Sequence, residues 1–295
     1  MLPVPDSIAK DLPVLIARAL AEDVGSGDVT TLATIPVNEQ AKAQFLAKAN
    51  GVLAGLAVAE RIFNAVDDGL STSWIASDGD TITTGAAFGE VEGYARSILT
   101  AERLALNLMQ RMSGIATASH LMAKAAAPST ILDTRKTAPG LRMLDKWAVQ
   151  LGGAANHRAG LFDMVLIKDN HIDSAGGIEA AISAAQGYLG DNDLDLAVEI
   201  ETRTLEEVDE VIRVGGVDRV MLDNMARKTG DGLDTSLLAE AVRRIGGRFE
   251  TEASGNVTLD TVSTIAATGV DFISSGALTH SVKALDISLK VTLTN

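Results

Sequence analysis

The sequence predicts an α/β protein in which parallel strands, each followed by a helix, form a barrel. After Pro128, six short apolar runs alternate with helix-like stretches at spacings of roughly 20–35 residues, which is typical of parallel βα units. The chain is 46% hydrophobic with 27 Gly and 3% aromatic residues, which suits a tightly wound core of small aliphatic side chains. No GxGxxG motif follows a first strand, so a barrel is favoured over an open dinucleotide-binding sheet.

The predicted elements of this part follow one another regularly. The strands are expected at 130–133, 164–168, 196–201, 219–223, 248–255 and 271–276, and the helices at 139–152, 178–189, 204–214, 234–246 and 258–269.

The first hundred residues have a different pattern. Ser7–Glu22 has the apolar spacing of one amphipathic helix, although Pro13 falls near its first turn, and 22–31 is a turn-rich loop. Between 41 and 91, short alternating runs separated by Gly and Asp-Gly indicate the strands of a small sheet, with a helix at 56–66.

A long apolar-periodic segment, 97–127, predicts one or two helices that end at Pro128 and link the two parts. The last apolar run, 284–293, reads as a strand that returns to the N-terminal sheet. At 295 residues one large or two unequal domains are expected, and we predict an N-terminal domain over 1–112, with 284–295 packed onto it, and a barrel domain over 113–283.

Composition excludes several classes of protein. A net charge of −14 and a pI near 4.7 argue against nucleic-acid binding, and the absence of Cys excludes disulfides and thiolate metal sites. The first dozen residues carry Asp6, Lys10 and Asp11 and do not resemble a secretory signal, and no run reaches the ~18 uncharged residues of a membrane span. We therefore expect a cytoplasmic protein that binds neither nucleic acid nor membrane.

Cations gather in one stretch of this acidic chain. Residues 133–171 hold six Lys/Arg against four Asp, and two of the four histidines, His157 and His171. A cationic cleft concentrates ligands of opposite charge, so the stretch predicts a site for a small, multiply charged anion. The alternative is that Arg135 and Lys136 pair with Asp133 and Asp145 at the surface.

The predicted strands all end in polar residues, and the active site of an α/β barrel lies at those ends. Strand alternation directs Glu199 and Glu201 into the barrel, with Glu201 nearer the rim and Asp223 ending the next strand. These last two carboxylates could hold one Mg²⁺ or Mn²⁺ ion. For Glu199 the alternative is an ion pair with Lys168 inside the barrel.

The last two strand ends, EASGN (252–256) and ISSGA (273–277), combine Gly with hydroxyl groups before helical segments. Backbone N–H groups there predict a phosphate site. With Arg135 and Arg158 able to bind carboxylates bidentately, and with His157 and Lys168 as further donors, the pocket suits a planar diacid beside a phosphate.

These residues occur in motifs that resemble the quinolinate phosphoribosyltransferase family. The motifs are EDVGSGDVT (22–30), ARSILTAERLALNLMQRMSGIAT (95–117), DTRKT (133–137), PGLR (139–142), GGAANHR (152–158), VLIKDNHI (165–172), EIE (199–201), MLDNM (221–225), EASGN (252–256) and SSGALTHS (274–281), and they cover nearly the whole chain in order. Ala138 departs from the pattern, since many relatives have Thr there.

The resemblance implies an N-terminal α/β sandwich domain, an incomplete, seven-stranded α/β barrel and a homodimer. It also implies transfer of phosphoribose from phosphoribosyl pyrophosphate to quinolinate, with release of pyrophosphate and CO₂, to give nicotinate mononucleotide for NAD synthesis.

By the same resemblance, quinolinate's carboxylates are expected on Arg135, His157, Arg158 and Lys168, with Arg103 reaching in from the partner subunit. The 5′-phosphate is expected on Ser254, Gly255, Asn256, Ser275 and Gly276, with His280 close by. Lys136, Glu201 and Asp223 are the expected catalytic residues: Lys136 between quinolinate and pyrophosphate, and the two acids on the ribose and Mg²⁺. No general base is assigned.

Three other functions stay open at this point. A Schiff-base aldolase would use Lys168 as its nucleophile. A molybdenum-associated paralogue shares the barrel and could use another acceptor, and a non-catalytic binding protein is the third alternative.

Overall fold

Residues 4–230 and 232–294 are described by a computed structural model of the chain, which divides into two units. Unit 1 comprises 1–120, 138–153 and 282–295, and unit 2 comprises 121–137 and 154–281. The predicted boundary between 112 and 113 stays a prediction. None of the helices among the described residues is long and apolar enough to cross a membrane.

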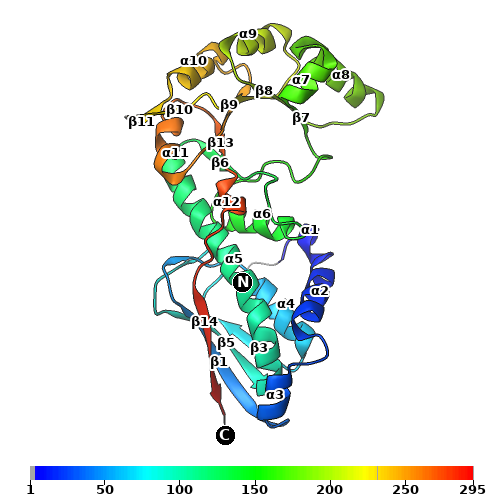
Figure 1. Cartoon of the computed structure of the whole chain (residues 1–295), viewed down its shortest axis with the longest axis vertical. Coiled ribbons are helices and arrows are strands. Elements are labelled where there is room, and N and C mark those ends of the chain that lie inside the picture. The colour runs from blue at the N-terminus through cyan, green and yellow to red at the C-terminus, as the bar shows by residue number, and fades with distance from the viewer. Residues whose placement is uncertain (1–3, 231, 295) are drawn as a thin grey trace. The chain divides into compact units, whose positions relative to one another are not determined.

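Unit 1 is built on a four-stranded antiparallel sheet in the order β14-β1-β5-β3 (Figure 1). In β1 (Gln40–Ala47) alternate residues are buried, and Phe45 meets the rings of Phe63, Trp74 and Phe88. The C-terminal strand β14 (Ile287–Leu293) pairs antiparallel with β1. The other strands are β2 (Gly51–Val52), β3 (Ser71–Trp74), β4 (Thr81–Ile82) and β5 (Ala87–Tyr94).

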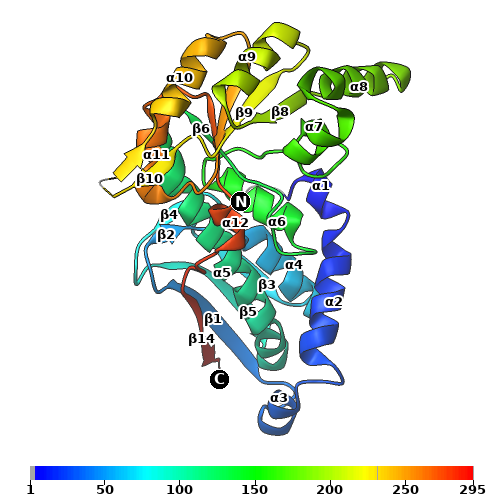
Figure 2. The same ribbon diagram turned by 45° about the horizontal axis from the view of Figure 1, so that its top comes forward.

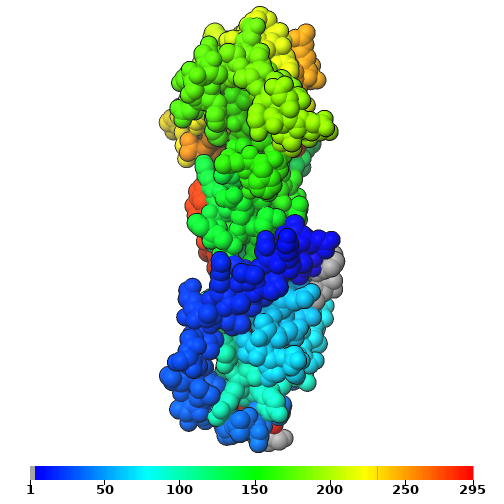
Figure 3. Space-filling model, turned by 90° about the vertical axis from the view of Figure 1, so that its right-hand side faces the viewer, coloured from blue at the N-terminus to red at the C-terminus, as the bar shows by residue number. Residues whose placement is uncertain are grey.

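The helices of unit 1 differ from the prediction at the N-terminus. The single helix predicted over Ser7–Glu22 is wrong: α1 (Asp6–Ala9) ends and α2 (Leu12–Val24) begins anew, because Pro13 has no N–H and its ring would clash with the carbonyl of Ala9 in a continuous helix. The turn-rich loop contains the start of α3 (Val29–Thr34), for which Asp28 caps the first turn. Figure 3 shows the N-terminal helices, in dark blue, on the surface of the segment that carries α4 (Leu56–Val66).

A single long helix, α5 (Ala95–Ala126), occupies the segment predicted as one or two helices. Within unit 1 it buries Ile98, Ala105 and Met109, and Arg111 pairs with Asp145 of α6 (Arg142–Leu151). Gly114 of α5 meets the chain near Lys283: an added Cβ would lie 2.3 Å from the carbonyl oxygen of Lys283.

We expect Gly114→Ala to destabilise the protein. The better helix propensity of Ala gains about 1 kcal/mol, but forcing a methyl group against backbone costs about 1–3 kcal/mol; at 2.3 Å the upper end applies, so the net loss is about 2 kcal/mol. Urea denaturation followed by circular dichroism measures the change. Gly187 in α8 is the matched control, because a Cβ there meets nothing within 4 Å and Gly187→Ala should stabilise instead. Equal shifts in the two variants would contradict the argument.

Unit 2 contains a six-stranded parallel sheet in the order β6-β13-β12-β9-β8-β7, which confirms the predicted α/β class and all six predicted strands. The strands are β6 (Thr130–Leu132), β7 (Val165–Ile167), β8 (Val198–Thr202), β9 (Arg219–Asp223), β12 (Glu250–Ser254) and β13 (Phe272–Ser274). Figure 2 shows α9 and α10 outside β8 and β9 of the curved sheet. The helices are α7 (Asp169–Ala175), α8 (Ile178–Asp191), α9 (Leu205–Val214), α10 (Ser236–Ile245), α11 (Leu259–Ala266) and α12 (Ala277–His280).

The seventh barrel strand implied by the resemblance is reduced to one residue in the described chain. Ala155 forms a parallel bridge with Leu132, at the free edge of β6, through hydrogen bonds to Ile131 and Asp133. His157 and Arg158 follow this bridge in a segment without regular secondary structure. A short hairpin of β10 (Arg227–Thr229) and β11 (Gly232–Asp234), which was not predicted, follows β9.

Candidate active site

The carboxyl ends of the parallel strands surround a cavity of about 520 Å³ that lies wholly within unit 2. Every strand of the sheet or the loop after it contributes to the lining. The lining includes Arg135, Lys136, His157, Arg158, Lys168, Glu201, Asp223 and Ser254, all of which were predicted site residues. The predicted convergence of the strand ends on one pocket is therefore what the fold produces.

The cationic wall of the cavity brings Arg135 and Arg158 together. Arg158 is partly buried, and its Nη1 donates to the carbonyl oxygen of Met164 at 3.2 Å. Burial, and secondly the charge of Arg135, lower the pKa of the Arg158 guanidinium. The positive charges of Arg135 and Arg158 repel each other, and a bound dianion would offset this repulsion. The pair therefore forms a favourable site for a dianion.

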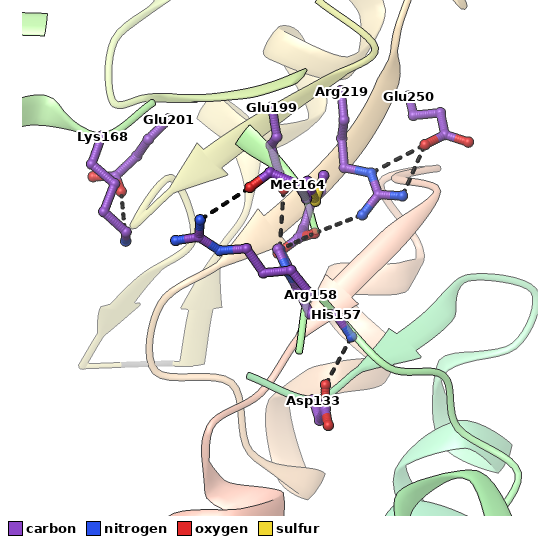
Figure 4. A network of polar contacts seen from close by, with 10 residues as sticks. Asp133, His157, Arg158, Met164, Lys168, Glu199, Glu201, Arg219 and Glu250 are labelled. Carbon is purple, nitrogen blue, oxygen red and sulfur yellow. Dashed lines mark hydrogen bonds and ion pairs between the residues drawn. The ribbon is translucent and has the colours of Figure 1, made fainter. Parts of the chain in front are cut away.

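Polar contacts surround His157, which lines the cavity (Figure 4). Its backbone N–H donates to Asp133 Oδ1 at 2.8 Å, and its Nδ1 accepts the backbone N–H of Arg158 at 2.7 Å. The ring proton therefore lies on Nε2, which faces Glu199 Oε2 at 3.1 Å and Glu252 Oε2 at 3.5 Å. The Nε2 atom of His157 is thus directed at two buried carboxyl groups.

The two predicted metal ligands, Glu201 and Asp223, both lie next to the guanidinium group of Arg203. Glu201 contacts Lys168 Nζ at 3.3 Å and Arg203 Nη2 at 2.8 Å, and Arg203 Nε lies 3.6 Å from Asp223. The side chain of Glu201 is 6% exposed and that of Asp223 is 14% exposed. Such a pair of nearly buried carboxylates, already facing a positive group, has the oxygen donors that a hard divalent cation prefers. Lys168 pairs with Glu201, so the alternative pairing of Lys168 with Glu199 is wrong.

The first of the two predicted phosphate loops, 252–256, takes up the left-handed backbone that amide nests use. Gly255 has φ +104° and Asn256 φ +51°, and both line a second cavity of about 650 Å³ that shares Arg203 and Asp223 with the first. A Cβ on Gly276 would lie 2.9 Å from both His280 and Lys136, so Gly276 lets these two side chains approach.

Ser275 lies deeper than the other members of the phosphate set. Its Oγ donates to the Val257 carbonyl, and its N–H donates to the carbonyl of Leu132. The neighbouring Ser274 lines the cavity. Arg103 lies on the part of α5 in unit 1, and its predicted place in a partner subunit's site stays a prediction.

Among the cavity residues that sequence reasoning missed are two charged ones, Arg203 and Glu252. Arg203 joins Asp169, Glu201 and Asp223, and it follows Glu201 by two residues in the chain. Glu252 was detectable, because strand alternation in ETEAS places it on the same face as Ser254. The same alternation had been applied to Glu199 and Glu201.

Comparison with known proteins gives consistent matches along the chain. The profile of "Quinolinate phosphoribosyl transferase, N-terminal domain" matches residues 28–113, and that of "Quinolinate phosphoribosyl transferase, C-terminal domain" matches residues 115–290. The chain is 57% identical to "Quinolinate phosphoribosyltransferase [decarboxylating] 1b" of Nicotiana tabacum, over 95% of this chain and 82% of that protein. It is equally similar, at 57% identity, to "Nicotinate-nucleotide pyrophosphorylase [carboxylating], chloroplastic" of Arabidopsis thaliana, over 95% and 83% of the two chains.

Solved structures agree with these matches. The nicotinate-nucleotide pyrophosphorylase of Francisella tularensis superposes with a TM-score of 0.88 at 38% identity, over 98% of each chain. That of Ehrlichia chaffeensis superposes with a TM-score of 0.85 at 34% identity, over 99% of this chain and 100% of the other.

Proposed function

The chain belongs to the quinolinate phosphoribosyltransferase family, and from this premise we propose how the residues of the unit 2 cavity carry out the family's reaction. The activity is phosphoribosyl transfer to quinolinate with decarboxylation, a pentosyltransferase reaction of NAD biosynthesis. The observation that carries the proposal is one cavity with cations on one wall and nearly buried acids on the other.

On the cationic wall, we assign quinolinate's carboxylates to Arg135, Arg158 and Lys168. The guanidinium groups suit planar carboxylates, and the mutual repulsion of Arg135 and Arg158 is relieved when a dianion binds. His157 orients this wall, because its backbone and ring fix the start of the Arg158 segment. Lys136, whose side chain lies near Gly276, is assigned to the space between quinolinate and the pyrophosphate of the second substrate.

On the acidic wall, we assign the ribose of phosphoribosyl pyrophosphate to Glu201 and Asp223, and its 5′-phosphate to the loops at Ser254–Asn256 and Gly276, near His280. Carboxylates beside the ribose favour the positive charge that develops as the pyrophosphate bond breaks. Glu201 and Asp223 would also hold Mg²⁺, which when bound neutralises charge on the leaving pyrophosphate. Arg203 must then leave its place between these two acids.

The reaction then follows from the bound geometry. The pyridine nitrogen attacks the ribose and becomes cationic, and the carboxylate on the adjacent carbon leaves as CO₂ because the ring nitrogen stabilises the electron pair left behind. A partly buried cavity favours this loss, since it solvates the departing charge poorly. We further propose the homodimer in which Arg103 reaches the partner's cavity, and a cytoplasmic location, although plant relatives are named as chloroplastic or mitochondrial.

The purified protein supplied with quinolinate, phosphoribosyl pyrophosphate and Mg²⁺ is expected to release CO₂ and pyrophosphate in equal amounts. Labelled carboxyl carbon and a coupled pyrophosphate assay measure the two products. Pyrophosphate without CO₂ would point to another acceptor. Borohydride trapping of a ketone substrate on Lys168 would favour the aldolase alternative.

A further inference from the structure

Loss of CO₂ leaves one chemical requirement unmet by the residues assigned so far. The electron pair of the broken carbon–carbon bond stays at C2 of the pyridinium ring, and the product carries hydrogen there. A proton must therefore reach C2 inside a cavity whose carboxylate-binding wall is cationic. Lys168 is a poor source, because it is paired with Glu201.

Glu252 of β12 is an acid that lines the same cavity. It lines the cavity together with Arg135, Arg158 and Lys168, yet its side chain is 0% exposed. Its Oε1 makes no hydrogen bond with any residue that the structure describes. The second oxygen, Oε2, lies 3.2 Å from Arg219 Nη1 and 3.5 Å from His157 Nε2.

The surroundings of Glu252 favour its protonated form. Burial and, secondly, the charge of Glu199 on β8 raise the pKa of Glu252 to about 7, although His157, the Ser274 hydroxyl on β13 and Arg219 on β9 act in the opposite direction. Ligand atoms of His157, Glu199 and Glu252 all lie within 4.8 Å of one another. Two buried carboxyl groups so close cannot both carry charge, so the cluster retains a proton near neutral pH.

We propose that the Glu252 carboxyl group is the general acid that protonates C2 after CO₂ leaves, an inference that rests on the proposed function. The bond between C2 and its carboxylate breaks, the electron pair remains at C2, and the Glu252 O–H bond then breaks as the C2–H bond forms. Glu252 is left as a carboxylate facing Arg219, and solvent returns its proton before the next turnover. Each cycle thus releases one CO₂ and takes up one proton.

The wild-type enzyme provides the first test. Because the acid must be protonated, kcat should fall as pH rises through about 7, where deprotonation of Glu252 removes the donor. A kcat that is flat from pH 6 to about pH 9 would overturn the proposal, without bearing on the activity itself. Absence of quinolinate turnover in the wild type at any pH would instead remove the proposed function.

Glu252→Gln provides the second test, since it keeps the shape of the side chain and removes the acid. Rapid quench should show first-turnover pyrophosphate release near the wild-type rate, but formation of nicotinate mononucleotide slowed roughly tenfold. This is below the ~100-fold typical of a general acid, because water can replace the donor. Calorimetric quinolinate affinity should stay within about threefold of the wild type.

The matched control is Glu250→Gln, because Glu250 is the other carboxylate on Arg219, at 2.9 Å, but is exposed and outside the cavity. Its kcat and pH profile should match the wild type. Equal loss in both variants would show that Arg219 packing, and not proton donation, was disturbed. Product formation by Glu252→Gln at the wild-type rate would also overturn the proposal; if that variant fails to fold, the wild-type pH profile decides.

Discussion

Arg158→Met is expected to raise the Kd for quinolinate by roughly 100-fold, because charge-assisted hydrogen bonds contribute about 1.5–3 kcal/mol each. Methionine keeps much of the apolar stem and removes the guanidinium. The pKa of Arg158 is lowered by burial and by the charge of Arg135, so this group is held at an electrostatic cost that a bound carboxylate offsets.

Ligand analogues sharpen this measurement. Isothermal titration with quinolinate, and with pyridine acids that lack either the 2- or the 3-carboxylate, separates the two carboxylate sites. Arg158→Met should weaken the binding of quinolinate strongly. It should weaken the binding of the analogue that lacks the carboxylate contacted by Arg158 only slightly. Arg213→Met is the control, because Arg213 pairs with Glu179 at 2.8 Å on the exposed side of the helices. Unchanged quinolinate affinity in Arg158→Met would show that the carboxylate assignment is wrong.

Most of the unit 2 fold could be predicted because its strands carry a strong local signal. Short apolar runs such as VMLD are buried wherever they occur in a parallel sheet, so β9 was predicted correctly at 219–223. The missed elements have no such signal: α7 has no buried residue, and β10 is exposed along its whole length. The break between α1 and α2 depends on one residue, Pro13, because apolar spacing alone does not register a missing N–H group.

The site was predictable to the extent that each residue stands at a strand end. Glu201 and Asp223 follow from alternation and position in the sequence, and they line one cavity. Partnerships across strands need the register: Glu252 lies opposite Met221, and this register brings Arg219 and Glu252 together. Orientation of His157 depends on a backbone turn, and no pattern in GGAANHR indicates which ring atom faces Glu199.

The ion-pair partner of Asp145 could not be predicted from the sequence. The sequence alternative paired Arg135 or Lys136 with Asp133 and Asp145 at the surface, but the Asp145 side chain is fully buried. It accepts two parallel hydrogen bonds from Arg111, Nε to Oδ1 at 2.8 Å and Nη2 to Oδ2 at 2.7 Å. The partner lies 34 residues earlier in the chain, on α5, so only the packing of α5 against α6 reveals the pair.

Asp145→Ala should therefore destabilise unit 1 by about 3 kcal/mol, because it leaves a largely buried guanidinium without its carboxylate. The Arg111 side chain is 25% exposed, which holds the loss at the lower end of the 3–5 kcal/mol typical of broken buried pairs. Unfolding in guanidinium chloride measures this loss of stability. The control is Glu240→Gln, which breaks the solvent-exposed pairs of Glu240 with Arg243 and Arg244 and should change the unfolding midpoint far less. The double variant Arg111→Met/Asp145→Ala should recover part of the loss, because no uncompensated charge then remains. If the double variant is as unstable as the sum of the two single variants, the two side chains do not act as a pair.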